Sequence, residues 1–199
     1  IFAESFRIPD IIGEGRIAVA PESLALLPPD RRFIAAASHQ GNWELAIGVL
    51  QQTGGDGAGI YQRIKNPLVE DYVRRLRAPL YPGGLWPKRE DAGRRALRHV
   101  RQGGVLATLA DLRAGDGLMV PFFGRPAYTM TLAARLVQQT GAQVCLAWGE
   151  RLPAGQGYRV HFRDLQAPLS ASLEEAVVQL NGEMERLVRE CPQQYLWSY

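Results

Sequence analysis

A histidine and a glutamate separated by four residues are the side chains best suited to do chemistry. Residues 39–44 read His-Gln-Gly-Asn-Trp-Glu and follow a short apolar run at 33–37. A histidine at a strand end can act as a general base when a carboxylate fixes its tautomer and stabilises the imidazolium. Because Glu44 falls in the first turn of the next expected helix, it can fold back toward His39. The pair is therefore predicted to deprotonate a hydroxyl that attacks an acyl carbon, with the helix N-terminus helping to hold negative charge.

The same residues also have purely structural interpretations. His39 can belong to a capped turn and Glu44 to the surface of the following helix, because this spacing often arises by chance. Asn42 is a plausible N-cap of that helix. The other two histidines, His99 and His161, lie in no clustered motif, so no metal site is predicted,.

Strand-like and helix-like segments alternate along the chain. Strands are predicted at 33–37, 58–62, 105–109, 143–148 and 158–162, helices at 44–52, 67–77, 90–102, 129–139 and 172–190, and loops at 78–88 and 115–125,. This order indicates an α/β fold with a largely parallel central sheet flanked by helices. Chemistry in such folds sits at the carboxyl ends of the strands, where His39 and Asp111 both fall.

Length and composition indicate one ordinary globular domain over residues 1–199. Apolar residues make up 46% of the 199 residues and charged residues 22%, which excludes a disordered or coiled-coil chain,. The two cysteines have no metal-like spacing, and no apolar run approaches the roughly 18 residues that span a bilayer. Because the chain begins at Ile1 without an initiator Met and stops at Tyr199 directly after an aromatic cluster, we expect native sequence beyond both ends, and an N-terminal membrane anchor in the parent protein stays open.

Positive charge is concentrated in one stretch. Residues 63–101 hold 11 Lys or Arg against four acidic residues, whereas the whole chain carries a net charge of only +3. Such a stretch favours phosphates, an anionic membrane surface or an acidic protein as partner, or is simply a solvated helix face. Interleaved aromatic residues and known nucleic-acid motifs are lacking, so nucleic-acid binding is not predicted.

The motif around His39 resembles the signature of the lipid A biosynthesis acyltransferases, within the wider glycerolipid acyltransferases that share His-x-x-x-x-Asp/Glu. Further blocks resemble the family in its own order along nearly the whole chain from about residue 14. These blocks are Tyr61 to Pro67, Gly103 to Asp111, Val120 to Gly124 with Pro126 to Thr129, Arg151 with Gly155 to Tyr158, and Pro192 to Trp197.

The resemblance implies a glycerolipid-acyltransferase-like fold. It also implies transfer of a fatty acyl group from an acyl carrier protein thioester to a hydroxyl of a lipid A precursor. His39 would take the hydroxyl proton, Glu44 would orient His39, and no metal or organic cofactor would be needed. The partners would be acyl carrier protein, an anionic phosphorylated lipid and the membrane surface, at the cytoplasmic face of the inner membrane of a Gram-negative bacterium. Substrate contacts are expected from Asn42, Arg63, Asn66, Asp111, Phe122, Phe123, Gly124 and Arg151.

Two departures from the family pattern keep alternatives open. Gln62 stands where the family has Arg, and Arg63 comes one residue later, which in a strand would turn it to the opposite face,. Leu112 follows Asp111 where Gln is common. Another acceptor (a glycolipid, lysophospholipid or amino-acid lipid) and thioester hydrolysis therefore remain alternatives. A non-catalytic lipid-binding domain is disfavoured because His39 and Glu44 are both present.

Overall fold

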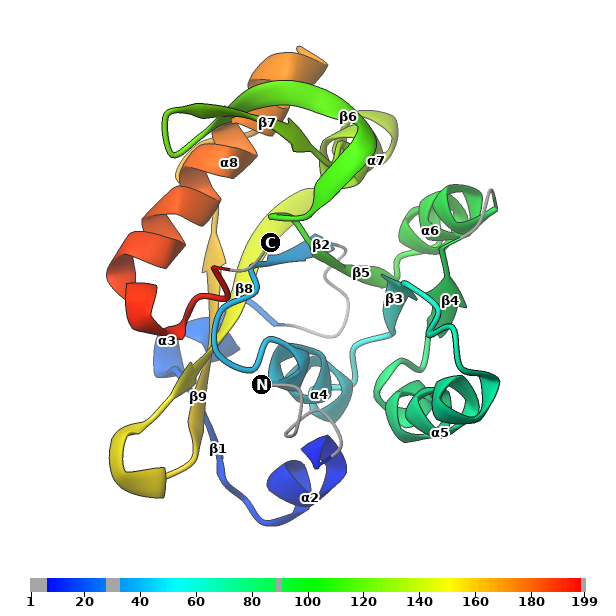
Figure 1. The fold of residues 1–199 in the computed structure, drawn as a ribbon, viewed down its shortest axis with the longest axis vertical. Helices are drawn as coiled ribbons and strands as arrows, with labels where there is room; N and C mark the ends of the chain where they lie inside the picture. Colours follow the sequence, from blue (N-terminus) through cyan, green and yellow to red (C-terminus); the bar gives the residue numbers. More distant parts are fainter. Residues whose placement is uncertain (1–6, 28–32, 89–90, 198–199) are drawn as a thin grey trace.

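A mostly parallel sheet forms the centre of the fold in the computed structural model, which describes residues 7–27, 33–88 and 91–197 (Figure 1). Within these residues the sheet has seven strands in the order β1-β9-β8-β2-β5-β3-β4. The strands are β1 Ile17–Val19, β2 Phe33–Ala37, β3 Gly57–Tyr61, β4 Gly84–Pro87, β5 Val105–Leu109, β8 Gln143–Arg151 and β9 Tyr158–Asp164. Within this sheet, only β8 and β9 pair antiparallel among the described strands, and every other neighbouring pair is parallel. The predicted α/β fold with a largely parallel sheet is confirmed.

Helices cover both faces of the sheet. They are α2 Ile8–Gly13, α3 Pro21–Leu24, α4 Glu44–Gln52, α5 Pro67–Arg77, α6 Ala92–Arg101, α7 Leu132–Thr140 and α8 Leu173–Glu190, with 3-10 turns at Ala78–Leu80, Pro153–Gly155 and Pro192–Gln194. Asn66 caps α5 and Ser172 caps α8, each through its side chain, as predicted. Position 90, predicted to start the helix that is observed as α6, lies outside the described residues. No described helix is both long and apolar enough to cross a bilayer.

Two apolar layers enclose the sheet. One packs Ile34 and Ala36 of β2 against α6, α7 and α8, and the other packs Phe33, Ala35 and Ala37 against α2 and α4. Strand β2 is buried on both faces, which explains why its sequence is continuously apolar rather than alternating,. Burial on both faces holds the carboxyl end of β2 in a rigid frame.

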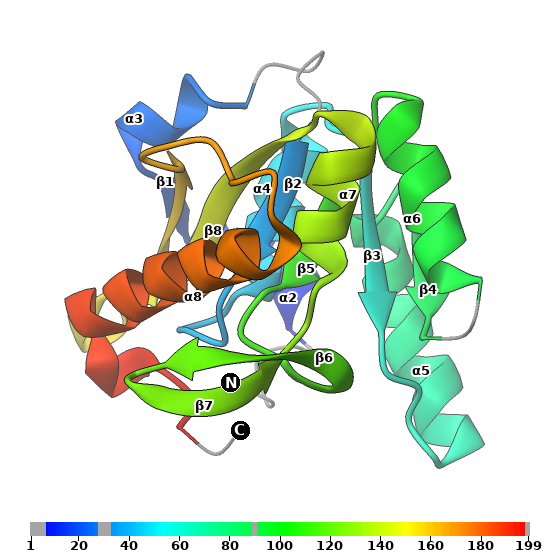
Figure 2. The same cartoon turned by 90° about the horizontal axis from the view of Figure 1, so that it is seen from above.

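A β-hairpin occupies the segment that was predicted as a loop at 115–125. Strands β6 Arg113–Phe122 and β7 Arg125–Thr129 pair antiparallel, with an irregularity between Arg113 and Leu118. Glycines and prolines in this segment hide the alternation that would indicate strands, so the prediction was wrong. Figure 2 shows the hairpin at the carboxyl end of the sheet, the end toward which the arrow of β3 points.

The other predicted loop, 78–88, was also wrong in part, because it contains β4 at the edge of the sheet. Strand β4 is only four residues long and includes Trp86 and Pro87. Proline is tolerated there because an edge strand need not donate every ladder hydrogen bond. The strands predicted at 33–37 and 105–109 and the helices predicted at 44–52 and 67–77 have the observed bounds. The other predicted helices and strands differ from the observed ones by a few residues at their ends.

Candidate active site

The carboxyl ends of β2 and β5 bring His39 and Asp111 together. The two strands are parallel neighbours in which Ala37 pairs with Leu109. His39 and Asp111 each come two residues after this pair, so they lie side by side. The backbone N–H of Ala110 also donates to the carbonyl of Ala37, across 2.8 Å. The register of two strands therefore places a histidine and an aspartate that are 72 residues apart in sequence in direct contact.

The carboxylate of Asp111 holds His39 at two points. One oxygen, Oδ1, lies 2.8 Å from the ring Nδ1, and the other, Oδ2, accepts the backbone N–H of His39 across 2.7 Å. The Asp111 side chain is fully buried and the His39 side chain is only 4% exposed. A carboxylate on Nδ1 favours the tautomer with a proton on Nδ1, which leaves the lone pair of Nε2 available as a base.

Glu44 has a different neighbour from the one predicted. Its Oε1 lies 2.6 Å from Nε of Arg77, at the end of α5, and no hydrogen bond or ion pair joins it to His39 among the described residues. The predicted contact between Glu44 and His39 is corrected: in this structure Asp111 orients the ring and Arg77 neutralises Glu44. Glu44 nevertheless lies in the first turn of α4, as expected.

The turn between β2 and α4 depends on close backbone packing. Gly41 has a φ of +55°, and a Cβ atom there would lie 1.8 Å from the carbonyl oxygen of Gly149 in β8. A Cβ on Gly149 would in turn lie 2.4 Å from the carbonyl oxygen of Asn42. Both positions require glycine because two main chains meet there.

The chain near its C-terminal end forms one wall of the site. The N–H of Gly41 donates to the carbonyl of Gln194, and the N–H of Leu196 donates to the carbonyl of His39, both across 2.9 Å. Between them, Tyr195 forms a bridge with Gln40. Burial, together with the charge of Asp111 and a hydrogen bond to it, raises the pKa of Tyr195. The hydroxyl of Tyr195 therefore stays protonated next to the Asp111 carboxylate.

Trp43 packs against the ring of His39. The ring centroids of Trp43 and His39 are 4.7 Å apart in an edge-on arrangement. Such a contact restricts rotation of the imidazole without adding a charge. The ring of His39 is thus held by a carboxylate, by its own backbone and by an aromatic neighbour.

Unpartnered buried polar atoms gather around this turn. Among the described residues, every buried side-chain nitrogen or oxygen without a hydrogen-bond partner belongs to the turn 38–44 or to Arg77. The atoms are Ser38 Oγ, Gln40 Oε1, both polar atoms of the Asn42 side chain, Glu44 Oε2 and Arg77 Nε, the last of which makes the ion pair with Glu44 Oε1 without forming a hydrogen bond. Folded proteins pair nearly all such groups, so a cluster of exceptions is typical of a site that a ligand completes.

Asn42 does not cap α4. Trp43 is the N-cap residue, and it makes no side-chain cap hydrogen bond, while the Asn42 side chain is buried without a partner. The cap prediction was wrong, because the Asn42 side chain accepts no N–H group of the helix. Its predicted role as a substrate contact remains a prediction.

Arg63 and Asn66 lie in the connection from β3 to α5, away from the sheet ladder. Strand β3 ends at Tyr61, so the argument that Arg63 faces the opposite side of a strand does not apply. The Nε atom of Arg63 lies 3.7 Å from Oε1 of Glu70. The Asn66 side chain accepts the N–H groups of Leu68 and Val69, which gives it a capping role.

Phe122, Phe123 and Gly124 form the tip of the hairpin. Phe123 and Gly124 have φ values of +49° and +73°, as in the tight turns that match strand twist,. The N–H of Phe123 donates to Oε1 of Glu185 across 2.7 Å, and the Arg189 guanidinium lies over its ring. These contacts dock the hairpin on α8, and both phenylalanines are half-buried.

Arg151 ends β8 and joins the wall formed by the C-terminal segment. Its N–H donates to Oε1 of Gln194 and its carbonyl accepts from Nε2 of the same side chain. Its guanidinium lies 5.4 Å from the ring centroid of Tyr158. The backbone of Arg151 therefore supports the segment that covers His39, while substrate contact by its side chain stays a prediction.

Sequence reasoning missed three features of this site. Asp111 was expected to touch substrate, whereas it holds the ring of His39. Arg77 was counted only as part of the basic stretch. Tyr195 was included only as part of the block Pro192 to Trp197. The signal for Asp111 was present, because it ends a strand directly after an apolar run, as His39 does; Tyr195 was marked only by the closing Pro-x-Gln-Tyr-x-Trp motif.

Comparisons with known proteins identify the family of the chain. A family profile described as bacterial lipid A biosynthesis acyltransferase matches residues 22–198. The chain belongs to this family. The structure resembles the crystal structure of PlsC, a 1-acyl-sn-glycerophosphate acyltransferase from Thermotoga maritima, with 23% identity and a TM-score of 0.49, over 88% of this chain and 72% of that one. A search of curated proteins finds no match.

Membership of the family identifies the chain as an acyltransferase that acts on lipid. His39 and Asp111 form a buried histidine–carboxylate pair in this chain. The described part of the chain contains no cluster of three or more His, Cys, Asp or Glu side chains that could hold a metal ion.

Proposed function

We propose that this acyltransferase moves a fatty acyl group from an acyl carrier protein thioester to a hydroxyl of a lipid A precursor. The observation that carries the mechanism is the 2.8 Å contact between Nδ1 of His39 and the buried carboxylate of Asp111. Family membership supports the lipid acceptor and the acyl donor. The contact thus supports His39 as the base, and family membership supports the two kinds of substrate.

The proposed reaction begins with proton transfer to His39. Nε2 takes the proton of the acceptor hydroxyl as its oxygen attacks the thioester carbonyl. The C–O bond forms, the C–S bond breaks, and the thiolate of the carrier leaves and is protonated by the imidazolium. Asp111 stabilises the imidazolium between these steps, which is the usual contribution of a carboxylate behind a histidine base.

We assign Glu44 a role in binding the acceptor rather than in holding the resting ring. Its Oε2 is buried without a hydrogen-bond partner, so a substrate hydroxyl can donate to it,. Arg77 keeps the carboxylate neutralised in the absence of substrate. The orientation of His39 by Glu44 during turnover remains the prediction made from the motif.

The basic stretch supports the proposed partners. Acyl carrier protein is acidic and the acceptor is phosphorylated, and both are attracted to positive charge. In the segment 63–77, five Lys or Arg stand against Glu70 and Asp71. We place the reaction at the cytoplasmic face of the inner membrane, where both substrates would meet.

A direct test compares wild type with His39→Ala in acyl transfer from labelled acyl carrier protein to a lipid A precursor. Loss of a general base predicts a decrease of about 10²-fold or more. His99→Gln is a matched control, because His99 lies at the amino edge of the sheet against the carbonyl of Asp56. If His39→Ala transfers as fast as wild type, the proposed mechanism is wrong.

A second acceptor class follows from the environment of Arg63. Its side chain is exposed beside Glu70, and the family's arginine position is occupied by Gln62. An altered phosphate contact favours a different lipid alcohol. If folded wild type transfers nothing to the lipid A precursor, a panel of lysophospholipid, glycolipid and amino-acid lipid acceptors identifies that class. Free fatty acid as the only product would instead show thioester hydrolysis.

A further inference from the structure

Helix α5 carries large apolar side chains on its solvent side. We call the group Ile64, Leu68, Val69 and Tyr72 the α5 apolar patch. Leu68 is 81% exposed and Tyr72 is 57% exposed, and Ile64 and Val69 are exposed as well. Leu68 and Tyr72 are four residues apart and Val69 and Tyr72 three apart, so they lie together on one side of the helix. Large apolar side chains grouped on a surface mark an interaction site more often than single ones do.

The patch is not a frayed helix end. Asn66 accepts the N–H groups of Leu68 and Val69, and Glu70 accepts the Tyr61 hydroxyl across 2.6 Å and the N–H of Ile64 across 2.9 Å. Glu70 and Val73, which are three residues apart and share one face of α5, are both buried,. The helix thus docks on the protein through one face and holds the patch rigidly outward through another.

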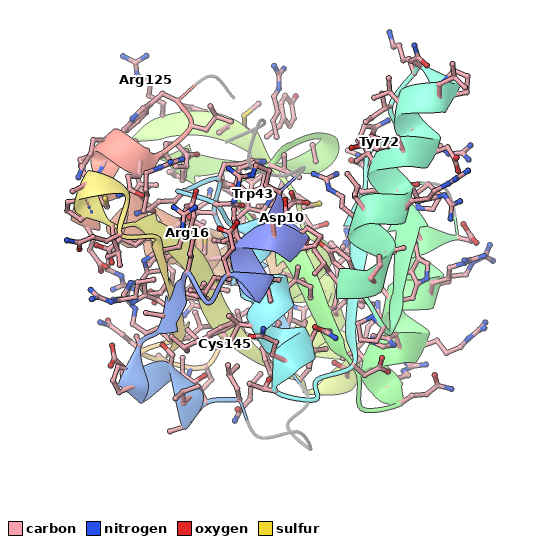
Figure 3. The ribbon with its side chains drawn as sticks, turned by 90° about the horizontal axis from the view of Figure 1, so that it is seen from below. Asp10, Arg16, Trp43, Tyr72, Arg125 and Cys145 are labelled. Atoms are coloured by element: carbon pink, nitrogen blue, oxygen red, sulfur yellow. The ribbon has the colours of Figure 1, made fainter. Side chains whose placement is uncertain are left out.

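The patch lies at the end of the sheet where the strands have their carboxyl ends, which is also the end that carries His39. Strand β3 is parallel to β2 and β5, and the chain enters α5 directly from its carboxyl end. Figure 2 shows the first turns of α5 projecting beyond the body of the protein at this end, and Figure 3 shows Tyr72 beside the outer half of the helix. His39 and the patch therefore both follow the carboxyl ends of parallel strands of the sheet.

Basic residues surround the patch. Arg63 and Lys65 precede the helix, and Arg74 and Arg75 follow Tyr72 on it, all exposed. The two acidic groups of the segment pair with three of these cations, Glu70 with Arg63 and Asp71 with Arg74 and Arg75, and the segment keeps a net positive charge. An apolar group ringed by cations, with a tyrosine among its members, is typical of a surface that lies in the headgroup region of an anionic bilayer.

We infer that the α5 apolar patch inserts into the surface of an anionic lipid bilayer and sets the active site over that surface. The patch projects at the end of a helix rather than lining a groove, which suits a deformable lipid layer better than a folded protein. The inference deepens the proposed function, on which it rests, because it states how a lipid acceptor would reach His39 from the membrane.

Vesicle sedimentation tests the inference without any acyl transfer. Wild type is compared with the double variant Leu68→Glu/Tyr72→Glu on mixed phosphatidylglycerol–phosphatidylcholine vesicles and on pure phosphatidylcholine vesicles. We expect the double variant to lose about tenfold or more in partitioning to the anionic vesicles, since it removes apolar insertion and adds two negative charges. Wild type should bind the anionic vesicles more tightly, and added salt should weaken that binding.

Leu24→Glu is the matched control. Leu24 is 54% exposed on α3, a helix that lies away from the projecting end of α5 (Figure 2). Its partitioning should stay within about twofold of wild type. Thermal unfolding is measured for wild type and both variants, to establish that all three proteins are folded at the assay temperature. Equal vesicle binding by wild type and the double variant would overturn the inference.

A binding assay with acyl carrier protein tests whether the patch docks a protein instead of a bilayer. If the double variant binds vesicles normally but loses affinity for acyl carrier protein, the patch is a protein-docking surface and the inference is wrong. Acyl transfer is then measured with the acceptor in vesicles and in detergent micelles. Loss of transfer only from vesicles supports the inference, whereas failure of wild type with every acceptor would refute the proposed function and leave the vesicle result standing.

Discussion

The contact between Asp111 and His39 leads to a sharp prediction for Asp111→Asn. The asparagine keeps the size of the side chain, and its oxygen can still accept the backbone N–H of His39. Its amide nitrogen, however, would face Nδ1 as a donor and force the proton to Nε2. The ring would then lack the lone pair that takes the hydroxyl proton, although the fold is preserved.

The size of the effect follows from the geometry. An imidazolium and a carboxylate 2.8 Å apart attract each other by about 6 kcal/mol at an effective dielectric constant of about 20,. Most of this stabilisation acts only once His39 is protonated, in the transition state. A loss of about 4–5.5 kcal/mol corresponds to a rate decrease of about 10³–10⁴-fold. We expect Asp111→Asn to fall in this range, close to His39→Ala.

Single-turnover acyl transfer from a labelled thioester is the assay, because it isolates the chemical step from binding and product release. Asp111→Asn, His39→Ala and the double variant should all have similar rates, since the two residues act as one unit. Glu44→Gln is the comparison variant and should raise the acceptor concentration needed more than it lowers the chemical rate. If Asp111→Asn keeps its rate within about threefold of wild type while Glu44→Gln loses about 10³-fold, Glu44 is the partner of His39 and the argument from the resting geometry fails.

Two further predictions concern the framework. Gly41→Ala should destabilise the protein by about 1–3 kcal/mol or more, because its Cβ would lie 1.8 Å from the Gly149 carbonyl oxygen,. Gly13→Ala is the control and should unfold near the wild-type temperature, because there is open space around the new Cβ. Equal melting temperatures of the two variants would contradict the packing argument. The Tyr61 hydrogen bond lowers the pKa of Glu70 below its ordinary value of about 4.5. The folded state therefore gains stability from the ionised Glu70 above that pH and loses it as the pH falls through the lowered pKa. The stability gap between wild type and Glu70→Gln in denaturant titrations should thus narrow in acid, and a gap that is constant with pH would rule this linkage out.

The unpartnered polar atoms near His39 lower the stability of this turn but are suited to binding a substrate. Leaving a buried polar group without a partner costs roughly 1–3 kcal/mol. Ser38, Asn42 and Glu44 each contribute such a group, and all lie within seven residues of the chain. A turn selected only for stability would pair them. A bound acceptor can pair them, so binding energy is available at the place where the hydroxyl must be aligned.

Much of the fold followed from local sequence. The apolar run at 33–37 marks a strand buried on both faces, Asn66 and Ser172 mark helix starts, and alternation of the elements indicates the parallel sheet. These features depend on interactions between residues a few positions apart, or on an apolar pattern that only one kind of element can bury. The position of His39 at a strand end was predictable for the same reason.

The partner of His39 was decided by the tertiary structure alone. The motif suggested Glu44, because it is near in sequence, but the register of β2 against β5 brings Asp111 to the ring and leaves Glu44 to Arg77. The hairpin of β6 and β7 and the placement of Tyr195 likewise depend on distant contacts. Spacing along one helix or turn reports only local neighbours, whereas strand register joins residues far apart in sequence, and the energy of that register is spread over the whole sheet.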